Sequence, residues 1–241
     1  MISFIVPAHN EEQFIAETLR AIRAAASRLP EAYELIVVDD ASTDRTAQIA
    51  TAAGARVQPV EHRQISRTRN AGARVASGDR FIFVDADTTI SESVVRATLH
   101  ALDGGAVGGG SAMRMEGRLP LYLHGVFAIT AFVMRRNRWA AGCYVFCTRA
   151  AFEAAGGFDE TLFASEEIAL SKSLQRLGRV VILDETVVTS GRKARSHSGW
   201  HLLWLLAVFA VRGDAMLRTR KHLGLWYGPR RKDQVKVEGK R

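Results

Sequence analysis

Cysteine is scarce in this chain, and long hydrophobic runs are absent. Its 241 residues include only two cysteines, Cys143 and Cys147, which are too few for a disulfide framework or a complete zinc site. We therefore expect two buried, reduced thiols in a cytoplasmic protein. No apolar run reaches the roughly 18 to 20 residues that cross a bilayer, and no basic region precedes the first apolar residues as in a signal peptide. The sequence thus does not predict a transmembrane protein.

Low-complexity segments, internal repeats and Pro/Ser-rich linkers are also absent. Hydrophobic residues make up 47% of the chain and charged residues 24%, which are the proportions of a globular protein and exclude disordered and collagen-like chains. Since no linker divides the chain, we predict one domain over residues 1–191, followed by an extension over residues 192–241.

The charge of the chain is unevenly distributed. Lys and Arg number 33 against 25 Asp and Glu, a net charge of +8. Residues 192–241 contain 13 basic and 3 acidic residues, so residues 1–191 carry 20 basic and 22 acidic ones. A basic segment of this kind favours an anionic partner, either nucleic acid or a membrane surface.

Short apolar runs alternate with segments of helical periodicity in the first half of the chain. Strands are predicted at Ile2–Pro7, Leu35–Val38 and Phe81–Val84, and helices over residues 11–26, 42–53 and 66–76. This alternation predicts an α/β fold with a mostly parallel sheet flanked by helices. Further on, we predict a bent strand over residues 104–115, strands over 143–147 and 180–183, a helix over 166–177, and an apolar, basic helical extension at the C-terminus.

Three of the predicted strands end in polar clusters. The first strand leads into Pro7-Ala8-His9-Asn10-Glu11-Glu12, the second into Asp39-Asp40 and the third into Asp85-Ala86-Asp87. The carboxyl ends of parallel strands form the ligand-binding edge of an α/β sheet. Clustered carboxylates repel one another unless a cation or a ligand rich in hydrogen-bond donors lies among them. Mg²⁺ or Mn²⁺, held together with substrate phosphates, suits oxygen ligands. Asp44 is better explained as a helix cap, and Ser42 or Thr43 as the N-cap residue.

Several motifs occur in one order along residues 2–190, and together they resemble glycosyltransferase family 2. The matching segments are 4–12 (FIVPAHNEE), 37–44 (VVDDASTD), 69–72 (RNAG), 76–79 (ASGD), 83–88 (FVDADT), 149–152 (RAAF) and 156–160 (GGFDE). The resemblance implies a GT-A fold, a nucleotide-diphosphate sugar donor, a divalent metal (Mn²⁺ or Mg²⁺) and an inverting mechanism. It also implies a nucleotide-sugar-binding half over residues 1–115 and an acceptor-binding half over residues 116–191.

The resemblance assigns expected roles to individual residues. Asp40 would accept a hydrogen bond from the base, Asp85 would face the ribose or sugar, and Asp87 would ligate the metal. The other residues expected near the nucleotide or its diphosphate are Pro7, Ala8, Glu11, Arg69 and Arg192. For Arg192, a solvent-exposed charge is an equally good reading.

The pair Glu166-Glu167 resembles the acidic pair with which this family begins a helix and supplies its catalytic base. Glu167 stands where the family usually has Asp, one methylene shorter, so its reach differs. An inverting transfer needs a base for the proton of the attacking hydroxyl. We expect Glu166 to raise the pKa of Glu167 by like-charge repulsion. Without the resemblance, both side chains would be interpreted as complements to the helix dipole.

Other polar residues carry weaker signals. His9 lies in the nucleotide loop, and His197 and His201 are interpreted as surface or interfacial residues, although either could approach a metal. The glycines of Gly104–Gly110 are not followed by Gly-Lys-Ser/Thr, so they predict a flexible bend in a strand and not a phosphate loop.

Two other functions stay open at this point. A nucleotidyltransferase would use a related sheet, but it would carry a Gly-rich basic loop after its first strand. A non-catalytic module that binds sugar nucleotides or nucleic acid would use the basic extension, but it would not need the acidic residues described above.

The extension contains an apolar run, Leu202–Val211, followed by basic residues. Ten helical residues cover about 15 Å, half of the hydrocarbon core, so a span is excluded while an interfacial helix is not. Leu119–Met134, which has no charged residue and precedes Arg135-Arg136-Asn137-Arg138, could supply a second contact. We expect a peripheral enzyme on the cytoplasmic face of the plasma membrane, with a saccharide or lipid-linked acceptor. The alternative is that both segments pack on the sheet or form the interface of a homo-oligomer, and nucleic acid is the least favoured partner.

Overall fold

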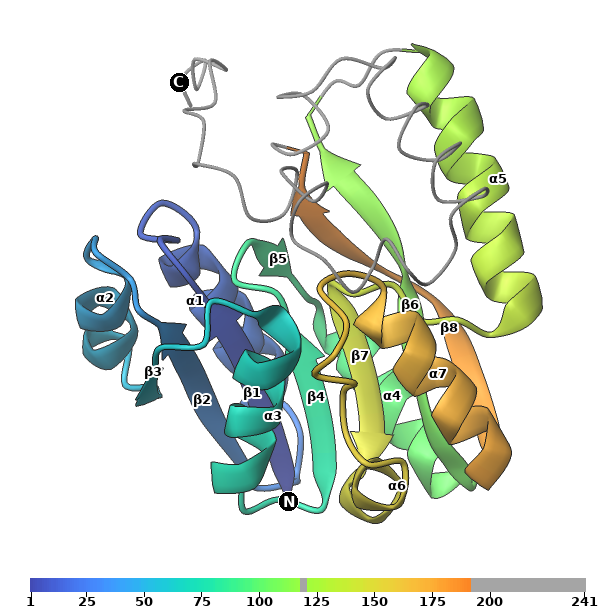
Figure 1. The fold of residues 1–241 in the computed structure, drawn as a ribbon, viewed down its shortest axis with the longest axis horizontal. Coiled ribbons are helices and arrows are strands. Elements are labelled where there is room, and N and C mark those ends of the chain that lie inside the picture. The colour runs from blue at the N-terminus through green and yellow to red at the C-terminus, as the bar shows by residue number, and fades with distance from the viewer. Residues whose placement is uncertain (118–120, 192–241) are drawn as a thin grey trace.

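The computed structural model describes residues 1–117 and 121–191, which form one eight-stranded sheet with helices on both faces (Figure 1). The strands are β1 (Ile2–Ala8), β2 (Tyr33–Asp40), β3 (Arg56–Val60), β4 (Arg80–Val84), β5 (Thr88–Thr89), β6 (Ala106–Glu116), β7 (Tyr144–Thr148) and β8 (Arg179–Ser190). The helices are α1 (Ile15–Ala26), α2 (Thr46–Ala52), α3 (Ile65–Val75), α4 (Glu92–Asp103), α5 (Leu121–Asn137), α6 (Arg149–Ala154) and α7 (Glu166–Leu177).

The strand order is β3-β2-β1-β4-β7-β6-β8-β5. The pairs β1–β2, β1–β4, β2–β3 and β6–β8 are parallel, and β7 runs antiparallel between β4 and β6. The predicted α/β class with a mostly parallel sheet is therefore confirmed. The expected division between residues 115 and 116 falls inside β6, and the strands of both halves share this sheet.

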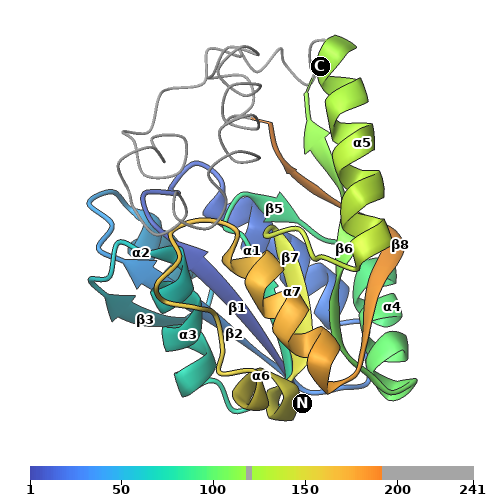
Figure 2. The same ribbon diagram turned by 45° about the vertical axis from the view of Figure 1, so that its right-hand side comes forward.

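A hydrophobic core covers each face of the sheet. The strands β1 and β4 are buried almost throughout, as expected for strands that helices cover on both faces. On one face they pack with α1 and α4, and on the other with α3, α6 and α7 (Figures 1 and 2). Cys143 and Cys147 are both buried and unpaired, and burial raises the pKa of each thiol.

The start of α2 differs from the sequence prediction. The helix begins at Thr46, and neither Ser42 nor Thr43 is its N-cap residue. Instead, Asp44 Oδ1 accepts a hydrogen bond from the Thr46 amide at 2.9 Å, as the capping interpretation of Asp44 predicts. Asp44 Oδ2 also accepts from the Glu12 amide at 3.1 Å, which connects the loops after β1 and β2.

The predicted glycine-rich strand is present as β6, and its register against β8 shifts between Ala106 and Gly108, inside the run where a bend was expected. Gly108, Gly109 and Gly110 lie inside the sheet between β7 and β8. A methyl group at Gly109 would lie 1.9 Å from the Val181 carbonyl oxygen, and one at Gly110 would lie 2.7 Å from Ala140 Cβ. Close approach of neighbouring chains, together with the register shift between Ser111 and Ala112, explains why glycine occupies this strand.

Helix α5 lies beside the upper ends of β6 and β8 (Figures 1 and 2), and its C-terminal end contacts α7, where Gln175 Nε2 donates to the Asn137 carbonyl at 2.7 Å. Several of its apolar side chains face solvent, including Ile129, Phe132 and Val133, which are 68%, 72% and 41% exposed. Among the residues that the structure describes, no helix is both long enough and apolar enough to cross a membrane.

Candidate functional site

The polar clusters that end β1, β2 and β4 meet at one edge of the sheet. β1 lies between β2 and β4, and Ala8 is in register with Asp39. Asp39 and Asp40 are the last residues of β2, whereas Asp85 directly follows β4. The strand-end pattern in the sequence therefore brings these carboxylates to the edge where α/β proteins bind ligands.

Arg69 of α3 connects this edge to the start of α7. Its guanidinium donates to Asp85 Oδ1 at 2.9 Å, to Glu166 Oε1 at 2.6 Å and to the Gly142 carbonyl at 2.7 Å. The side chain is 2% exposed, and its Cζ lies 5.2 Å from the centroid of the Phe158 ring. Arg69 thus fixes three segments that are far apart in the sequence.

The charge of Arg69 is maintained by the carboxylates around it. Burial alone would lower the pKa of the guanidinium, but Asp85, Glu166 and Glu167 together raise it above its usual value. Its Nη atoms are occupied by protein acceptors, while its buried Nε has no hydrogen-bond partner in the described part of the chain. The hydrogen-bond partners of Arg69 are therefore Asp85, Glu166 and Gly142, and its expected contact with the nucleotide stays a prediction.

Glu166 and Glu167 occupy the first turn of α7, as predicted, but in different environments. Glu166 is 4% exposed and forms the ion pair with Arg69, whereas Glu167 is half-buried and free of that pairing. Ser165, just before them, has a φ of +60°, a backbone conformation that costs on the order of 1–3 kcal/mol for a non-glycine residue. Both carboxylates thus follow a strained residue at the helix start. Glu166 is engaged in the ion pair with Arg69, whereas Glu167 is not.

The carboxylate of Glu167 lies against the backbone of Gly142. A methyl group at Gly142 would lie 3.2 Å from both Cδ and Oε1 of Glu167. Burial, and then the neighbouring charge of Glu166, raise the pKa of Glu167 to about 8, while Arg69 opposes the shift. The predicted direction is therefore confirmed, but burial contributes more than the like-charge repulsion on which the sequence argument depended.

Asp85 and Asp87 are the carboxylates that we expect near a divalent cation. Asp85 is 25% exposed with Oδ1 occupied by Arg69, and Asp87 is half-buried in the turn before β5. No group of three or more His, Cys, Asp or Glu side chains among the described residues is arranged to hold a metal ion. The donor set fits a cation that is bound jointly with phosphate oxygens and water, as Mg²⁺ commonly is, and not a site built from protein ligands alone.

Asp40 has its carboxylate occupied by the chain itself. Oδ1 accepts from the amides of His62 and Arg63, both at 2.7 Å, and Oδ2 accepts from the Gln64 amide and the Thr68 hydroxyl. In contrast, Oδ1 of neighbouring Asp39 is buried without a hydrogen-bond partner in the described residues. Asp39 was not predicted as a binding residue, because two adjacent aspartates at a strand end carry no signal that tells them apart.

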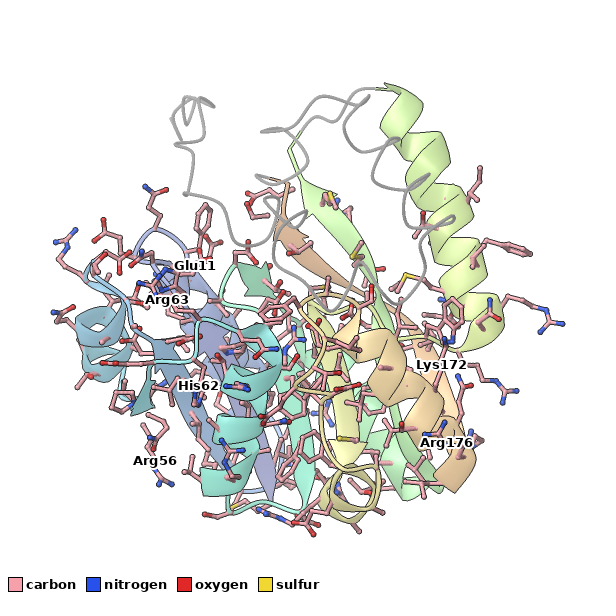
Figure 3. All side chains as sticks on the ribbon, viewed as in Figure 1. Glu11, Arg56, His62, Arg63, Lys172 and Arg176 are labelled. Atoms are coloured by element: carbon pink, nitrogen blue, oxygen red, sulfur yellow. The ribbon has the colours of Figure 1, made fainter. Side chains whose placement is uncertain are left out.

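His9 and Arg63 form a polar contact beside Asp40. His9 Nδ1 lies 2.8 Å from the Asp40 carbonyl, which can only accept, so Nδ1 carries the proton. His9 Nε2 then accepts from Arg63 Nη1 at 2.7 Å. Figure 3 shows Arg63 near Glu11, at the end of the molecule where β1 and β2 terminate. Arg63 was not predicted, since its position depends on the turn that Asp40 holds.

The remaining predicted residues divide into two groups. Pro7, Ala8 and Glu11 are buried at the end of β1, and the Glu11 amide donates to Thr46 Oγ1 at 2.8 Å. The Ser190 amide donates to the Asp87 carbonyl at 3.0 Å, so β8 ends beside the expected metal ligand. Arg192, His197, His201 and Leu202–Val211 lie outside the described residues.

Comparison with known proteins connects this site to one family. Residues 3–154 match the family described as glycosyl transferase family 2. The undecaprenyl-phosphate 4-deoxy-4-formamido-L-arabinose transferase of Pseudomonas aeruginosa is 35% identical over 94 residues, which are 36% of this chain and 28% of that protein. The 4,4'-diaponeurosporenoate glycosyltransferase of Staphylococcus haemolyticus is 35% identical over 109 residues, 42% of this chain and 26% of that one. The matches thus span little more than a quarter of these relatives.

Solved structures resemble a larger part of the chain. S. aureus TarS 1–349 in complex with UDP-GlcNAc superposes with a TM-score of 0.66 at 19% identity, covering 93% of this chain and 78% of that one. The mannosyltransferase PcManGT from Pyrobaculum calidifontis, in complex with GDP-Man and Mn²⁺, has a TM-score of 0.66 at 21% identity, covering 87% and 61%. At these identities the likeness concerns the fold.

Proposed function

Because the chain belongs to glycosyl transferase family 2 and has the GT-A fold, we propose that it transfers a sugar, with inversion, from a nucleotide-diphosphate sugar to an acceptor hydroxyl. The observation that carries this proposal is the buried Arg69. It joins Asp85 on the donor side to the helix start that bears Glu166 and Glu167. A donor bound at the strand ends and an acceptor near α7 would then meet at a fixed separation, which is the main requirement of a transfer reaction.

The donor would bind across the ends of β1 and β2. The similar structures of TarS and PcManGT hold UDP-GlcNAc and GDP-Man, which supports a nucleotide sugar as the donor class. The unpartnered Oδ1 of Asp39 is the better acceptor for a base N–H, since Asp40 already receives four donors. Pro7, Ala8 and Glu11 would line the same nucleotide pocket, with Arg192 toward the diphosphate.

A divalent cation fits the donor set of Asp87 with the free oxygen of Asp85. When bound there with the diphosphate, Mn²⁺ or Mg²⁺ would offset the negative charge that develops on the leaving group. The Mn²⁺ in the PcManGT complex supports a metal of this kind. Asp87 would be its direct ligand, while Arg69 restrains Asp85.

Glu167 would act as the general base. In the reaction, the acceptor oxygen forms a bond to the anomeric carbon on the face opposite the leaving group, and the bond from that carbon to the diphosphate breaks. Glu167 takes the proton of the attacking hydroxyl, and the nucleoside diphosphate departs. A carboxylate with a pKa of about 8 is a stronger base than an ordinary glutamate, and it acts in the fraction of molecules in which it has lost its proton, a fraction that grows as pH rises toward 8. Glu166 would serve by orienting Arg69.

A lipid-linked acceptor at a membrane surface is the substrate class that we favour. The Pseudomonas aeruginosa relative is named for undecaprenyl phosphate. The exposed apolar residues of α5, followed by Arg135, Arg136 and Arg138, would suit contact with an anionic leaflet. A non-catalytic binding module is a poorer reading, because it would not require the available Glu167 carboxylate.

The test is release of nucleoside diphosphate from a panel that includes UDP-GlcNAc and GDP-Man, with Mn²⁺ or Mg²⁺. We expect slow release with at least one donor, and loss of this activity in Asp87→Ala or in excess chelator, while the thermal unfolding midpoint stays close to that of the wild type. Full activity in the chelator would remove the metal from the mechanism. Release of pyrophosphate in place of nucleoside diphosphate would indicate a nucleotidyltransferase.

A further inference from the structure

A cavity of about 740 Å³ lies between α5 and the sheet, outside the donor site. Its walls come from the end of β6, one face of α5, the segment after α5, and β8. The lining includes Met113, Met115, Phe132, Met134, Trp139 and Ile182. Its volume is within the range of cavities that bind small organic ligands, roughly 300–1,000 Å³. Its predominantly apolar lining suits a hydrocarbon ligand.

The cavity adjoins the proposed catalytic groups at two points. Ala141 lines it, and the next residue, Gly142, lies against the Glu167 carboxylate. At the end of β6, Glu116 lines it and is in register with Ser190, whose amide donates to the Asp87 carbonyl. A ligand in this cavity would therefore have one end near the reacting groups.

Three lining residues carry a charge that an apolar ligand alone would not need: Arg114, Arg135 and Glu116. Arg114 is exposed, and no hydrogen bond or ion pair of its side chain is found within the described residues. The other lining guanidinium, that of Arg135, is already engaged by Asp184 and by the Leu183 carbonyl. An available guanidinium beside an apolar cavity suits a phosphate attached to a hydrocarbon chain.

We propose that this cavity binds the isoprenoid chain of a lipid-linked saccharide acceptor, with Arg114 at the phosphate that joins the chain to the saccharide and with the attacking hydroxyl on the saccharide. The proposal rests on the proposed transferase function and specifies the substrate class at the acceptor side. The isoprenoid chain would cover the exposed side chains of Met113 and Phe132. Each of its methylene groups that becomes buried would strengthen binding by a factor of about four.

The experiment measures binding of dimethylallyl phosphate (five carbons) and farnesyl phosphate (fifteen carbons) to the full chain by calorimetry, below the micelle-forming concentration. We expect farnesyl phosphate to bind at least about tenfold more tightly. Met134→Asp and Thr130→Trp, which alter lining residues, should remove most of this preference. Val133→Asp is the matched control, because Val133 is on the same helix but does not line the cavity. This variant should keep the wild-type preference for farnesyl phosphate. Arg114→Gln should weaken both ligands alike.

Equal affinity for the two phosphates would overturn the proposal. This result is expected if an apolar segment of the protein itself, or a second copy of the protein, occupies the cavity. Retention of the preference by both lining variants would overturn it too. Nucleoside diphosphate release is measured in parallel without acceptor. If the wild type releases diphosphate but shows no chain-length preference, only the cavity assignment fails. If the preference is present but no donor is turned over, the transferase proposal fails and the cavity assignment stands.

Discussion

Arg69 fixes the positions of the groups that it binds, namely Asp85, Glu166 and the Gly142 carbonyl. Removal of one partner from a buried ion pair typically costs about 3–5 kcal/mol, because the other charge is left without compensation. Arg69 has two such partners, Asp85 and Glu166, and a third acceptor in the Gly142 carbonyl. The planar guanidinium can bind all three at once, whereas a lysine ammonium lacks this fork geometry. The separation between Asp85 and the start of α7 thus depends on this one side chain.

Glu167→Gln should keep donor affinity and lose turnover by a factor on the order of 10² to 10⁴, because proton abstraction occurs in the transition state and not in the donor complex. In the wild type, kcat/KM should rise with pH through about 8, as Glu167 loses its proton, and this limb should be absent from the variant. Steady-state kinetics of nucleoside diphosphate formation measure both effects. Normal turnover of Glu167→Gln with a crippled Glu166→Gln would instead assign the base to Glu166.

The same raised pKa has a consequence for stability. The folded state binds the Glu167 proton more tightly than the unfolded state does, so its contribution is fully present below the unfolded pKa near 4.5 and is lost as pH rises through about 8. The melting temperature of Glu167→Gln should therefore increase relative to the wild type between pH 5 and pH 9. A constant difference across this range would contradict the raised pKa.

Gly142→Ala should lower kcat without a matching change in donor affinity. The added methyl group would lie 3.2 Å from Glu167 Oε1, so the carboxylate must move by a few tenths of an ångström or more. Gly125→Ala in α5 is the control, since a methyl group there meets no atom within 4 Å and alanine favours a helix by about 0.5–1 kcal/mol. Kinetics and thermal unfolding of both variants separate displacement of the base from loss of stability. Unchanged kcat in Gly142→Ala would remove Gly142 from base positioning.

At the scale of elements, β6 is the strand on which the second half of the sheet depends. It pairs with antiparallel β7 on one side and parallel β8 on the other, and it also forms a wall of the apolar cavity. The glycines of β6 permit this close packing. Helix α7 also has two functions, since its first turn lies at the candidate site and its apolar face packs in the core. The same elements therefore stabilise the fold and position the proposed acceptor side.

Gly109→Ala should destabilise the protein by about 1–3 kcal/mol or more, because the new methyl group would lie 1.9 Å from the backbone oxygen of Val181 and the strands must separate. Chemical denaturation measures the change in the free energy of unfolding. Gly105→Ala is not a suitable comparison, since its φ of +82° would add backbone strain, so Gly125→Ala serves again. A Gly109→Ala variant as stable as the wild type would contradict the close approach of β6 and β8.

On the scale of the whole molecule, α5 and the residues just after it combine exposed apolar side chains with the exposed Arg136 and Arg138. The full chain should float with anionic liposomes at low salt, and less so as salt increases, because the attraction is between exposed charges. Arg136→Glu with Arg138→Glu should reduce flotation, at roughly 1 kcal/mol for each charge removed. The matched control is Arg20→Glu with Arg23→Glu, which reverses the charge of two exposed arginines on α1. If the full chain stays in the soluble fraction at low salt, membrane contact is wrong and assembly into an oligomer becomes the better explanation of the exposed α5 residues.

The sequence by itself determined the features that depend on neighbouring residues. Buried runs such as Ile2–Ala8 and Phe81–Val84, the acidic residues that follow them, and a helix starting at Glu166 can each be recognised within ten residues or fewer, because strand burial and helix starts are local patterns. The order of the motifs was enough to indicate the family. The short edge strand β3 was missed, since its exposed residues and Pro59 carry little strand signal.

Only the tertiary structure decided which polar groups are occupied and which are available. Arg69 reaches Asp85 across 16 positions and Glu166 across 97, and no local pattern predicts partners at such separations. The two aspartates that end β2 look alike in the sequence, yet the fold surrounds Asp40 with four donors and leaves Asp39 Oδ1 without one in the described chain. The environment of Glu167 has the same origin: burial by residues distant in sequence determines its pKa, because the energy of a charge depends on everything packed around it.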